Sequence, residues 1–168
     1  MSVTMYQASI PVFQKMLGNL SGILSKAAEY AETRGIAPSA LLATRLFADM
    51  FPLLRQVQLA SDFAKGAGAR LAGIDSPVFP DTETTFAELQ ERLTKTQDFL
   101  ASLTPDQING SEDRPISFKI HDMEFNFTGI GFLTGFATPN FYFHLTTAYA
   151  ILRMSGLDVG KKDFVGSI

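Results

Sequence analysis

Cysteine is absent from this 168-residue sequence. Disulfide bonds, thiolate metal sites, cysteine nucleophiles and thiol redox centres are therefore excluded. Histidine is also scarce, because the chain has two, and this leaves few neutral metal ligands. We therefore expect no tightly bound structural metal.

A strong charge of one sign and long apolar runs are also missing. The formal net charge is −3, and the pair Lys161-Lys162 is too short to bind phosphates, so we expect no nucleic-acid partner. No apolar run approaches the roughly 20 residues that span a bilayer, so we expect no membrane partner. The sequence Met-Ser-Val-Thr-Met at the start lacks the basic and apolar regions of a signal peptide, and we expect a cytoplasmic protein.

The length and the apolar content are sufficient for one hydrophobic core. Hydrophobic residues make up 46% of the chain, and a domain of this size buries roughly 70% of its unfolded surface. No internal repeat or low-complexity segment divides the sequence. We therefore expect a single domain over residues 1–168.

Apolar residues recur every three or four positions in four segments, which predicts four amphipathic helices. The expected helices cover residues 9–34, 50–72, 85–103 and 139–155. Arg34 and Gly35 provide a typical end for the first helix. Pro11 lies either in the first turn after a Ser9 cap or inside a helix that starts near Thr4.

Polar residues before the other helices predict their starts. Asp49 is expected to cap the second helix with its carboxylate, and Thr138 to cap the last helix with Pro139 at its first position. Thr85 and Glu88 have the spacing of a capping box, in which each side chain accepts a backbone N–H of the other residue.

The periodicity changes to an alternation of apolar and polar residues between the third and fourth helices. Two such runs flank His121-Asp122 and predict a β-hairpin over residues 115–128, with His121 exposed in the turn. The tail, residues 157–168, is expected to be extended. The predicted fold is mainly all-α: a four-helix bundle with a small β-hairpin between its third and fourth helices.

His144 is the main candidate for a functional residue, because it lies in an otherwise apolar helix. It is either a hydrogen-bonded core residue or a metal ligand, for which Asp62, Asn140 and Asp49 are the other candidates. We expect the ring inside the bundle against the second helix, with Asp62 or Gln58 as its partner, because a buried imidazole without one costs roughly 1–3 kcal/mol.

Two further groups each have more than one interpretation. Gln58 and Asp62, with Lys65 nearby, form either a solvated or intrahelical polar pair or the polar floor of a pocket that includes Asn140 and His144. An aromatic group near the hairpin and the last helix is either core, a wall for a ligand, or a dimer face. Its members are Phe125, Phe127, Phe132, Phe136, Phe141, Tyr142 and Phe143.

The order of the four helices and two sequence segments together resemble the DinB/YfiT-like superfamily. More narrowly, they resemble its bacterial branch of domains of unknown function. The two segments are Asp49-Met-Phe-Pro-Leu-Leu-Arg-Gln-Val-Gln-Leu-Ala and Pro139-Asn-Phe-Tyr-Phe-His-Leu-Thr-Thr-Ala-Tyr. The resemblance covers nearly the whole chain and implies a four-helix bundle and a homodimer. It also implies a metal held by three histidines, one on the second helix and two on the last helix one turn apart. Some members of the superfamily are thiol S-transferases or hydrolases.

The chain departs from this metal-binding pattern. Its second helix has no histidine, and the positions one turn either side of His144 are Asn140 and Ala148. The implied metal site is therefore incomplete. Two functions follow: a dimeric small-molecule-binding or interaction protein, or a metal-dependent thiol S-transferase or hydrolase that binds zinc or nickel through His144 with Asp and Asn partners. The second rests on analogy of fold alone.

Overall fold

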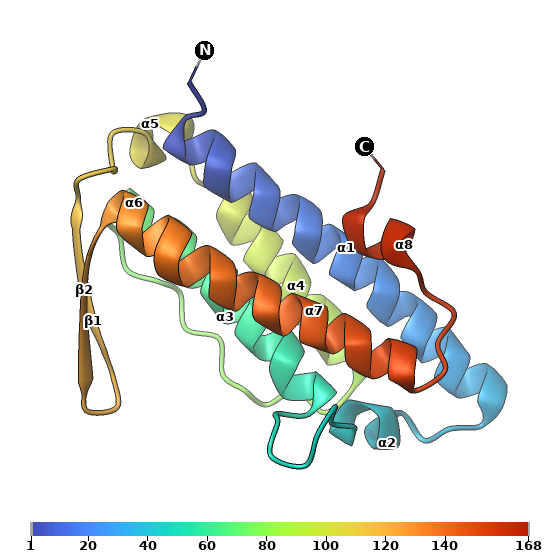
Figure 1. Cartoon of the computed structure of the whole chain (residues 1–168). Helices are drawn as coiled ribbons and strands as arrows, with labels where there is room; N and C mark the ends of the chain where they lie inside the picture. Colours follow the sequence, from blue (N-terminus) through green and yellow to red (C-terminus); the bar gives the residue numbers. More distant parts are fainter. Residues whose placement is uncertain (1, 168) are drawn as a thin grey trace.

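Four long helices form the bundle in the structure, a computed structural model that describes residues 2–167 (Figure 1). They are α1 (Met5–Arg34), α3 (Leu53–Ala72), α4 (Phe86–Ala101) and α7 (Thr138–Met154). Shorter elements are α2 (Pro38–Ala43), α5 (Pro105–Ile108), α6 (Gly129–Phe132), the π-helical turn η1 (Leu133–Ala137) and α8 (Lys161–Val165). The strands β1 (Pro115–Ile120) and β2 (Met123–Thr128) pair antiparallel. This arrangement confirms the expected helical bundle with a hairpin between its third and fourth long helices.

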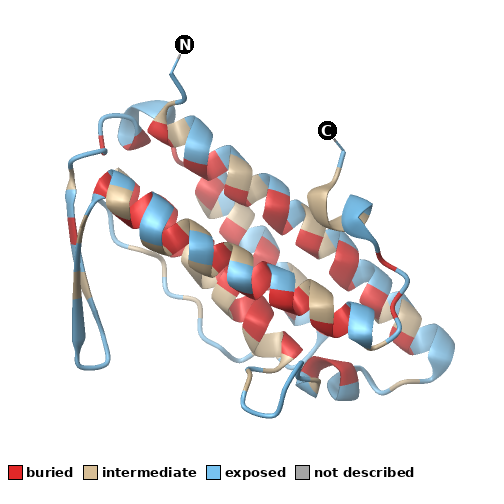
Figure 2. Cartoon of the chain, in the orientation of Figure 1, coloured by how far each residue is buried: buried red, intermediate tan, exposed pale blue. Residues whose placement is uncertain are grey.

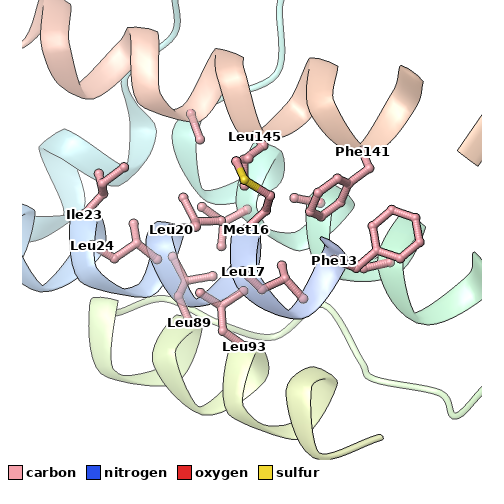
Figure 3. Packing of buried hydrophobic residues seen from close by; sticks show 14 of the residues in the cluster. Phe13, Met16, Leu17, Leu20, Ile23, Leu24, Leu89, Leu93, Phe141 and Leu145 are labelled. Atoms are coloured by element: carbon pink, nitrogen blue, oxygen red, sulfur yellow. The ribbon is translucent and has the colours of Figure 1, made fainter. Parts of the chain in front are cut away.

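The hydrophobic core lies between the long helices, because each presents one apolar face to the others (Figure 2). Phe13 of α1 meets Phe141 of α7 edge to face, with ring centroids 4.9 Å apart. Leu17 of α1 lies beside Leu89 and Leu93 of α4 (Figure 3). Full burial of one such side chain contributes about 1.5–3 kcal/mol to the stability of the folded state. Within residues 2–167, no helix combines the length and apolar composition that crossing a membrane requires.

The start of α1 settles the two alternatives for Pro11. Thr4 is the N-cap, and its hydroxyl accepts from the backbone N–H of Gln7 at 3.2 Å while the Gln7 side chain accepts from the Thr4 N–H at 3.1 Å. Pro11 therefore lies inside the helix. Ser9 is not a cap, because its hydroxyl donates to the Met5 carbonyl at 2.6 Å.

The capping box of Thr85 and Glu88 is confirmed, whereas the cap expected from Asp49 is wrong. α3 follows Pro52, which has extended backbone angles (φ −69°, ψ 164°) and provides no side-chain cap. The residue before a proline is disfavoured in helical geometry, so the helix cannot begin as early as residue 50. Asp49 therefore lies exposed, too far from the first turn to accept its N–H groups.

The cap expected from Thr138 is also wrong, because the helix begins much earlier. Ala137 is already helical (φ −64°, ψ −53°), and α6, η1 and α7 form one continuous run (Figure 1). The Thr128 hydroxyl caps this run by accepting from the Gly131 N–H at 3.3 Å. The π-helical turn comes shortly before Pro139, whose ring removes the backbone donor that a regular α-helix would use there.

The tail is not fully extended, contrary to expectation, because it contains α8. Asp163 stabilises the start of this helix by accepting from the Gly160 N–H at 2.8 Å. The same residue pairs with Lys26 of α1 at 2.5 Å, and Asn19 of α1 donates to the Phe164 carbonyl at 2.9 Å. These contacts fix the tail against α1.

The hairpin has one apolar and one polar face. In its register Phe118 faces Phe125 and Lys119 faces Glu124, so side chains alternate between the two faces. His121 is exposed in the turn of the hairpin, as predicted. Its backbone takes the left-handed conformation (φ 52°) there. The apolar face consists of Ile116, Phe118, Ile120, Met123, Phe125 and Phe127. The hairpin stands beside the bundle and joins it near α6 (Figure 1).

Gly129 lies at the junction between the hairpin and the last helix, where the backbone of Ser111 approaches it closely. A Cβ at this position would lie 1.8 Å from the Ser111 backbone oxygen, so Gly129→Ala should lower the free energy of unfolding by about 1–3 kcal/mol or more. Gly22→Ala on α1 is the matched control, because a Cβ there meets nothing within 4 Å. It should raise stability by about 0.5–1 kcal/mol. Urea unfolding measures both, and equal effects of the two substitutions would refute this explanation.

Candidate functional site

His144 lies inside the bundle against α3, as predicted, but its partner is a different residue. The Nδ1 atom of His144 is 2.8 Å from Oε1 of Gln56, and neither Asp62 nor Gln58 contacts the ring through a hydrogen bond. The Gln56 amide nitrogen donates to the Phe51 carbonyl at 3.1 Å, so its oxygen accepts from the imidazole. The proton of His144 therefore sits on Nδ1.

The surroundings of His144 keep its ring neutral. Its ring is 5.4 Å from that of Phe63 in a stacked arrangement, and Phe143 meets it edge to face at 5.2 Å. Burial, together with the positive charge of Arg55, lowers the pKa of His144 to about 4. Near pH 7 the ring is thus a hydrogen-bond donor without charge, as expected when burial outweighs charge partners.

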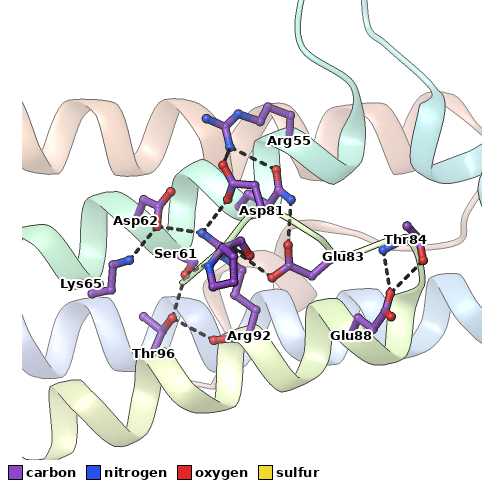
Figure 4. Close-up of polar contacts among 12 residues, drawn as sticks. Arg55, Ser61, Asp62, Lys65, Asp81, Glu83, Thr84, Glu88, Arg92 and Thr96 are labelled. Carbon is purple, nitrogen blue, oxygen red and sulfur yellow. Dashed lines mark hydrogen bonds and ion pairs between the residues drawn. The ribbon is translucent and has the colours of Figure 1, made fainter. Parts of the chain in front are cut away.

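Asp62 belongs to a cluster of charges around a buried arginine (Figure 4). The side chain of Arg92 on α4 is 1% exposed, and its Nη2 atom lies 2.8 Å from Asp62 Oδ1 and 3.0 Å from Asp81 Oδ1. Its Nη1 atom lies 2.9 Å from Glu83 Oε1. Lys65 contacts the same oxygen of Asp62 at 3.0 Å. The cluster thus connects α3, α4 and the loop between them.

Gln58 and Arg55 extend this cluster along α3. The Gln58 amide donates to Glu83 Oε2 at 2.8 Å, and Arg55 donates to Gln58 at 3.2 Å and pairs with Asp81. Asp62 therefore keeps an intrahelical ion pair with Lys65, but Gln58 and Asp62 also contact residues outside α3 and are not simply solvated. Gln58 attaches the loop of residues 74–85 to α3, and Asp62 attaches α4 through Arg92. Sequence spacing could not reveal these two contacts, because the partners lie more than 20 positions away.

Charge in the cluster is balanced, with three cations and three carboxylates among the described contacts: Arg55, Lys65, Arg92, Asp62, Asp81 and Glu83. Burial acts to lower the pKa of Arg92, but the hydrogen bond to Glu83 and the neighbouring carboxylates outweigh it and raise that pKa. Burial likewise acts to raise the pKa of Glu83, and the bonds from Arg92 and Gln58 lower it overall. Both groups stay ionised, which favours a structural role.

The structure does not assemble the proposed metal ligands. His144 bonds Gln56, Asp62 bonds Arg92 and Lys65, and the Asn140 amide donates to the Phe136 carbonyl at 2.7 Å. Asp49 is exposed in a turn. Across residues 2–167, no three histidine or carboxylate side chains are placed to hold a metal ion. The donor set available at His144 therefore does not fit zinc or nickel.

A cavity of about 190 Å³ opens between α3, the hairpin and η1. Its lining is largely aromatic, and ring centroids are 5.3 Å apart for Phe118 and Phe136 and 5.8 Å apart for Phe63 and Phe136. The lining residues are Leu59, Asp62, Phe63, Arg70, Phe118, Lys119, Ile120, Phe132 and Phe136. A shallower pocket of about 340 Å³ under residues 76–79 shares Asp62 and Arg70 with it. Residues of α3 thus line both pockets.

The members of the aromatic group recognised in the sequence lie in different surroundings. Phe132 and Phe136 line the cavity, whereas Phe125 and Phe127 pack against Phe136 with centroids 5.5 Å away. Phe141 is core, and Tyr142 packs on it at 5.5 Å. Phe143 is 55% exposed and points outward. Members of this group therefore lie on the cavity wall, in the core or at the surface.

Sequence reasoning identified Asp62 as a pocket candidate but missed Arg70, Leu59 and Phe63, which line the same side of the cavity. Arg70 follows a stretch of small residues, and such a stretch does not by itself indicate a site. In the structure, a Cβ at position 66 would lie 2.6 Å from Arg70 Nη1. The glycine leaves the space into which the guanidinium folds.

Comparisons with known proteins agree with the geometry of the bundle. A family model described as a domain of unknown function (DUF1993) matches residues 5–165. The crystal structure of a DinB family member protein from Shewanella denitrificans is 39% identical to this chain and covers 97% of it and 92% of its own chain, with a TM-score of 0.87. No curated protein matches.

The buried, neutral state of His144 predicts a component of pH-dependent stability. The ordinary pKa of 6.5 applies when the chain is unfolded, and the folded pKa is about 4. As the pH falls from 6.5 to 4, the unfolded state takes up a proton that the folded state does not. The stability contributed by the neutral ring, complete above pH 6.5, should therefore decrease by about 3 kcal/mol over this range.

His144→Gln separates this component from the carboxylates, because the variant keeps every other titrating group. The difference in unfolding free energy between wild type and His144→Gln should move by about 3 kcal/mol in favour of the variant between pH 7 and pH 4. Urea unfolding across this range measures it. A difference that stays constant with pH would show that the ring is not buried and neutral.

Proposed function

We infer that this chain, which belongs to the DUF1993 family within the DinB-like superfamily, binds a small molecule in the cavity between α3 and the hairpin. The observation that supports this most is the aromatic lining beside the polar groups of α3, since ligand sites are mainly apolar with a few placed polar groups. The apolar face of the hairpin forms the outer wall. Its distal end is incompletely covered, and Met123 is 59% exposed.

The size of the cavity limits the ligand. Pockets for drug-sized molecules measure roughly 300–1,000 Å³, and this cavity of about 190 Å³ is smaller. A single ring with a short polar group matches it. Phe63, Phe118 and Phe136 in the lining offer aromatic surfaces for such a ring.

The alternative of a metal-dependent thiol S-transferase or hydrolase has less support in this chain. The hydrogen bond between His144 and Gln56 joins the same two helices from which the superfamily resemblance draws its ligands. Gln56 is a poor substitute for histidine, and within residues 2–167 no carboxylate pair completes the set. The incomplete site therefore favours binding without a metal.

Phenylacetamide, a neutral ring with a short amide, tests the binding proposal. With about 0.3 kcal/mol per atom for its ten heavy atoms, we expect dissociation constants near the millimolar range. Leu59→Trp fills the cavity and should weaken binding at least tenfold, whereas Leu54→Trp, on α3 but outside the lining, should leave it unchanged. Ligand-observed NMR measures both. Equal affinities of the two variants would reject the cavity as the site.

We also propose a homodimer, on the basis of the superfamily resemblance and of exposed aromatic residues beside the Gln56–His144 pair. Phe51 accepts a hydrogen bond from Gln56 through its carbonyl, and the ring of Phe143 packs edge to face on His144. Both phenylalanine residues are more than half exposed. Two-fold dimers are the commonest assemblies, and such residues are enriched in their interfaces.

Light scattering at micromolar concentration should give twice the chain mass of 18.4 kDa. Phe143→Glu should yield the monomer by placing charges at the interface. Met154→Glu, at an equally exposed position at the end of α7, is the matched control and should stay dimeric. A monomeric wild type would rule out the dimer.

A further inference from the structure

We propose that the ligand of the cavity is an organic anion, a carboxylate attached to a small ring, and that Arg70 holds the carboxylate. This inference rests on the proposed binding function and adds the chemical class of the ligand. It begins from a contrast between two arginines. Arg92 is surrounded by three carboxylates, whereas Arg70, which is partly buried in the cavity wall, has no carboxylate within 4 Å among residues 2–167.

The contacts of Arg70 leave most of its donors free. Its Nη1 atom donates to the Gly66 carbonyl at 3.2 Å, the one hydrogen bond that its side chain makes to residues 2–167. The guanidinium carbon lies 4.6 Å from the ring centre of Phe118 and 5.8 Å from that of Phe132. A cation held over a ring uses the face of the guanidinium, and its N–H groups lie along the edges.

The free edges suit a carboxylate. A guanidinium presents its donors in a planar fork that matches the two oxygens of a carboxylate, and such paired bonds are about twice as strong as neutral ones. The rings of Phe118 and Phe132 lie against the guanidinium, and one of its N–H groups is engaged, by the Gly66 carbonyl. A ligand ring placed among Phe63, Phe118 and Phe136 could therefore direct its carboxylate at Arg70.

The other charges of the cavity do not oppose an anion. Asp62 is the one carboxylate in the described lining, and its Oδ1 atom is already shared by Lys65 and Arg92 at 3.0 and 2.8 Å. Lys119 adds a second cation at the hairpin wall. Burial lowers the pKa of Arg70, in agreement with a cation that has no carboxylate to compensate for lost water. A bound carboxylate would supply that compensation.

Gly66 shows how the sequence places this group. The guanidinium folds back over the helix one turn before Arg70, where a Cβ would approach Nη1 to 2.6 Å. Any other residue at position 66 would push the guanidinium away from the Gly66 carbonyl. Gly66→Ala therefore displaces the charge without removing it.

The test compares phenylacetate with phenylacetamide, which have nearly the same shape and differ in charge. Wild type should bind phenylacetate at least tenfold more tightly. Arg70→Gln should abolish this preference while still binding the amide, and Arg70→Lys should keep a part of it, because lysine retains the charge without the fork. Arg34→Gln is the matched control, since Arg34 also lies over a ring, that of Tyr30, at the end of α1 and outside the cavity.

The outcomes distinguish this inference from the binding proposal. Equal affinity of wild type for the two compounds, with both weakened by Leu59→Trp, would overturn the anion and leave the cavity as a binding site. Equal loss of preference in Arg34→Gln and Arg70→Gln would also overturn it. Failure of both compounds to bind wild type would reject both proposals. Retention of amide binding by Arg70→Gln shows that the cavity is intact and that the lost preference is due to the charge.

Discussion

The buried positive charge of Arg92 is the constraint on which the arrangement around α3 depends. The Arg92 side chain is 1% exposed, and a charge buried to this extent without a partner would strongly destabilise the folded state. The fold must therefore place carboxylates next to the guanidinium. Asp62 comes from α3, and Asp81 and Glu83 come from the loop before α4. The loop is thereby fixed across two helices, and the charge of Asp62 is used within the cluster. The cavity beside Asp62 is left with Arg70 and Lys119 as cations that have no ion pair among residues 2–167.

Side chains on different faces of α3 contact different neighbours and therefore have different roles. Gln56 and Gln58 are two residues apart, which is a rotation of about 200° around a helix, so they point to opposite sides. Gln56 therefore faces α7 and bonds His144, whereas Gln58 faces the loop and bonds Glu83. Beyond Asp62, Gly66 lines the shallower pocket and Arg70 lines both pockets. A single helix thus supports a neutral hydrogen bond, a charge cluster and a candidate binding surface.

Local signals in the sequence were sufficient for much of the fold. The three-to-four spacing identified the long helices, the spacing of Thr85 and Glu88 identified a helix start, and the alternation around His121 identified the hairpin. The helical run before Thr138 was missed because its glycines and Pro139 are typical of connectors. The site was less accessible. His144 stood out by composition, but its partner depends on helix rotation, and the Arg92 cluster and Arg70 depend on a loop and a hairpin that approach α3 only after folding.

The central claim is that the cavity between α3 and the hairpin, and not the His144 region, is the binding site of this chain. Methyl NMR of the protein during titration with phenylacetamide tests it most directly, because Leu59 and Ile120 line opposite walls of the cavity. We predict saturable shifts and ligand contacts at these two methyl-bearing residues, with Leu20 and Leu24 in the core unchanged. Shifts centred on Leu145 and Ile151 of α7, with Leu59 and Ile120 unaffected, would contradict the account.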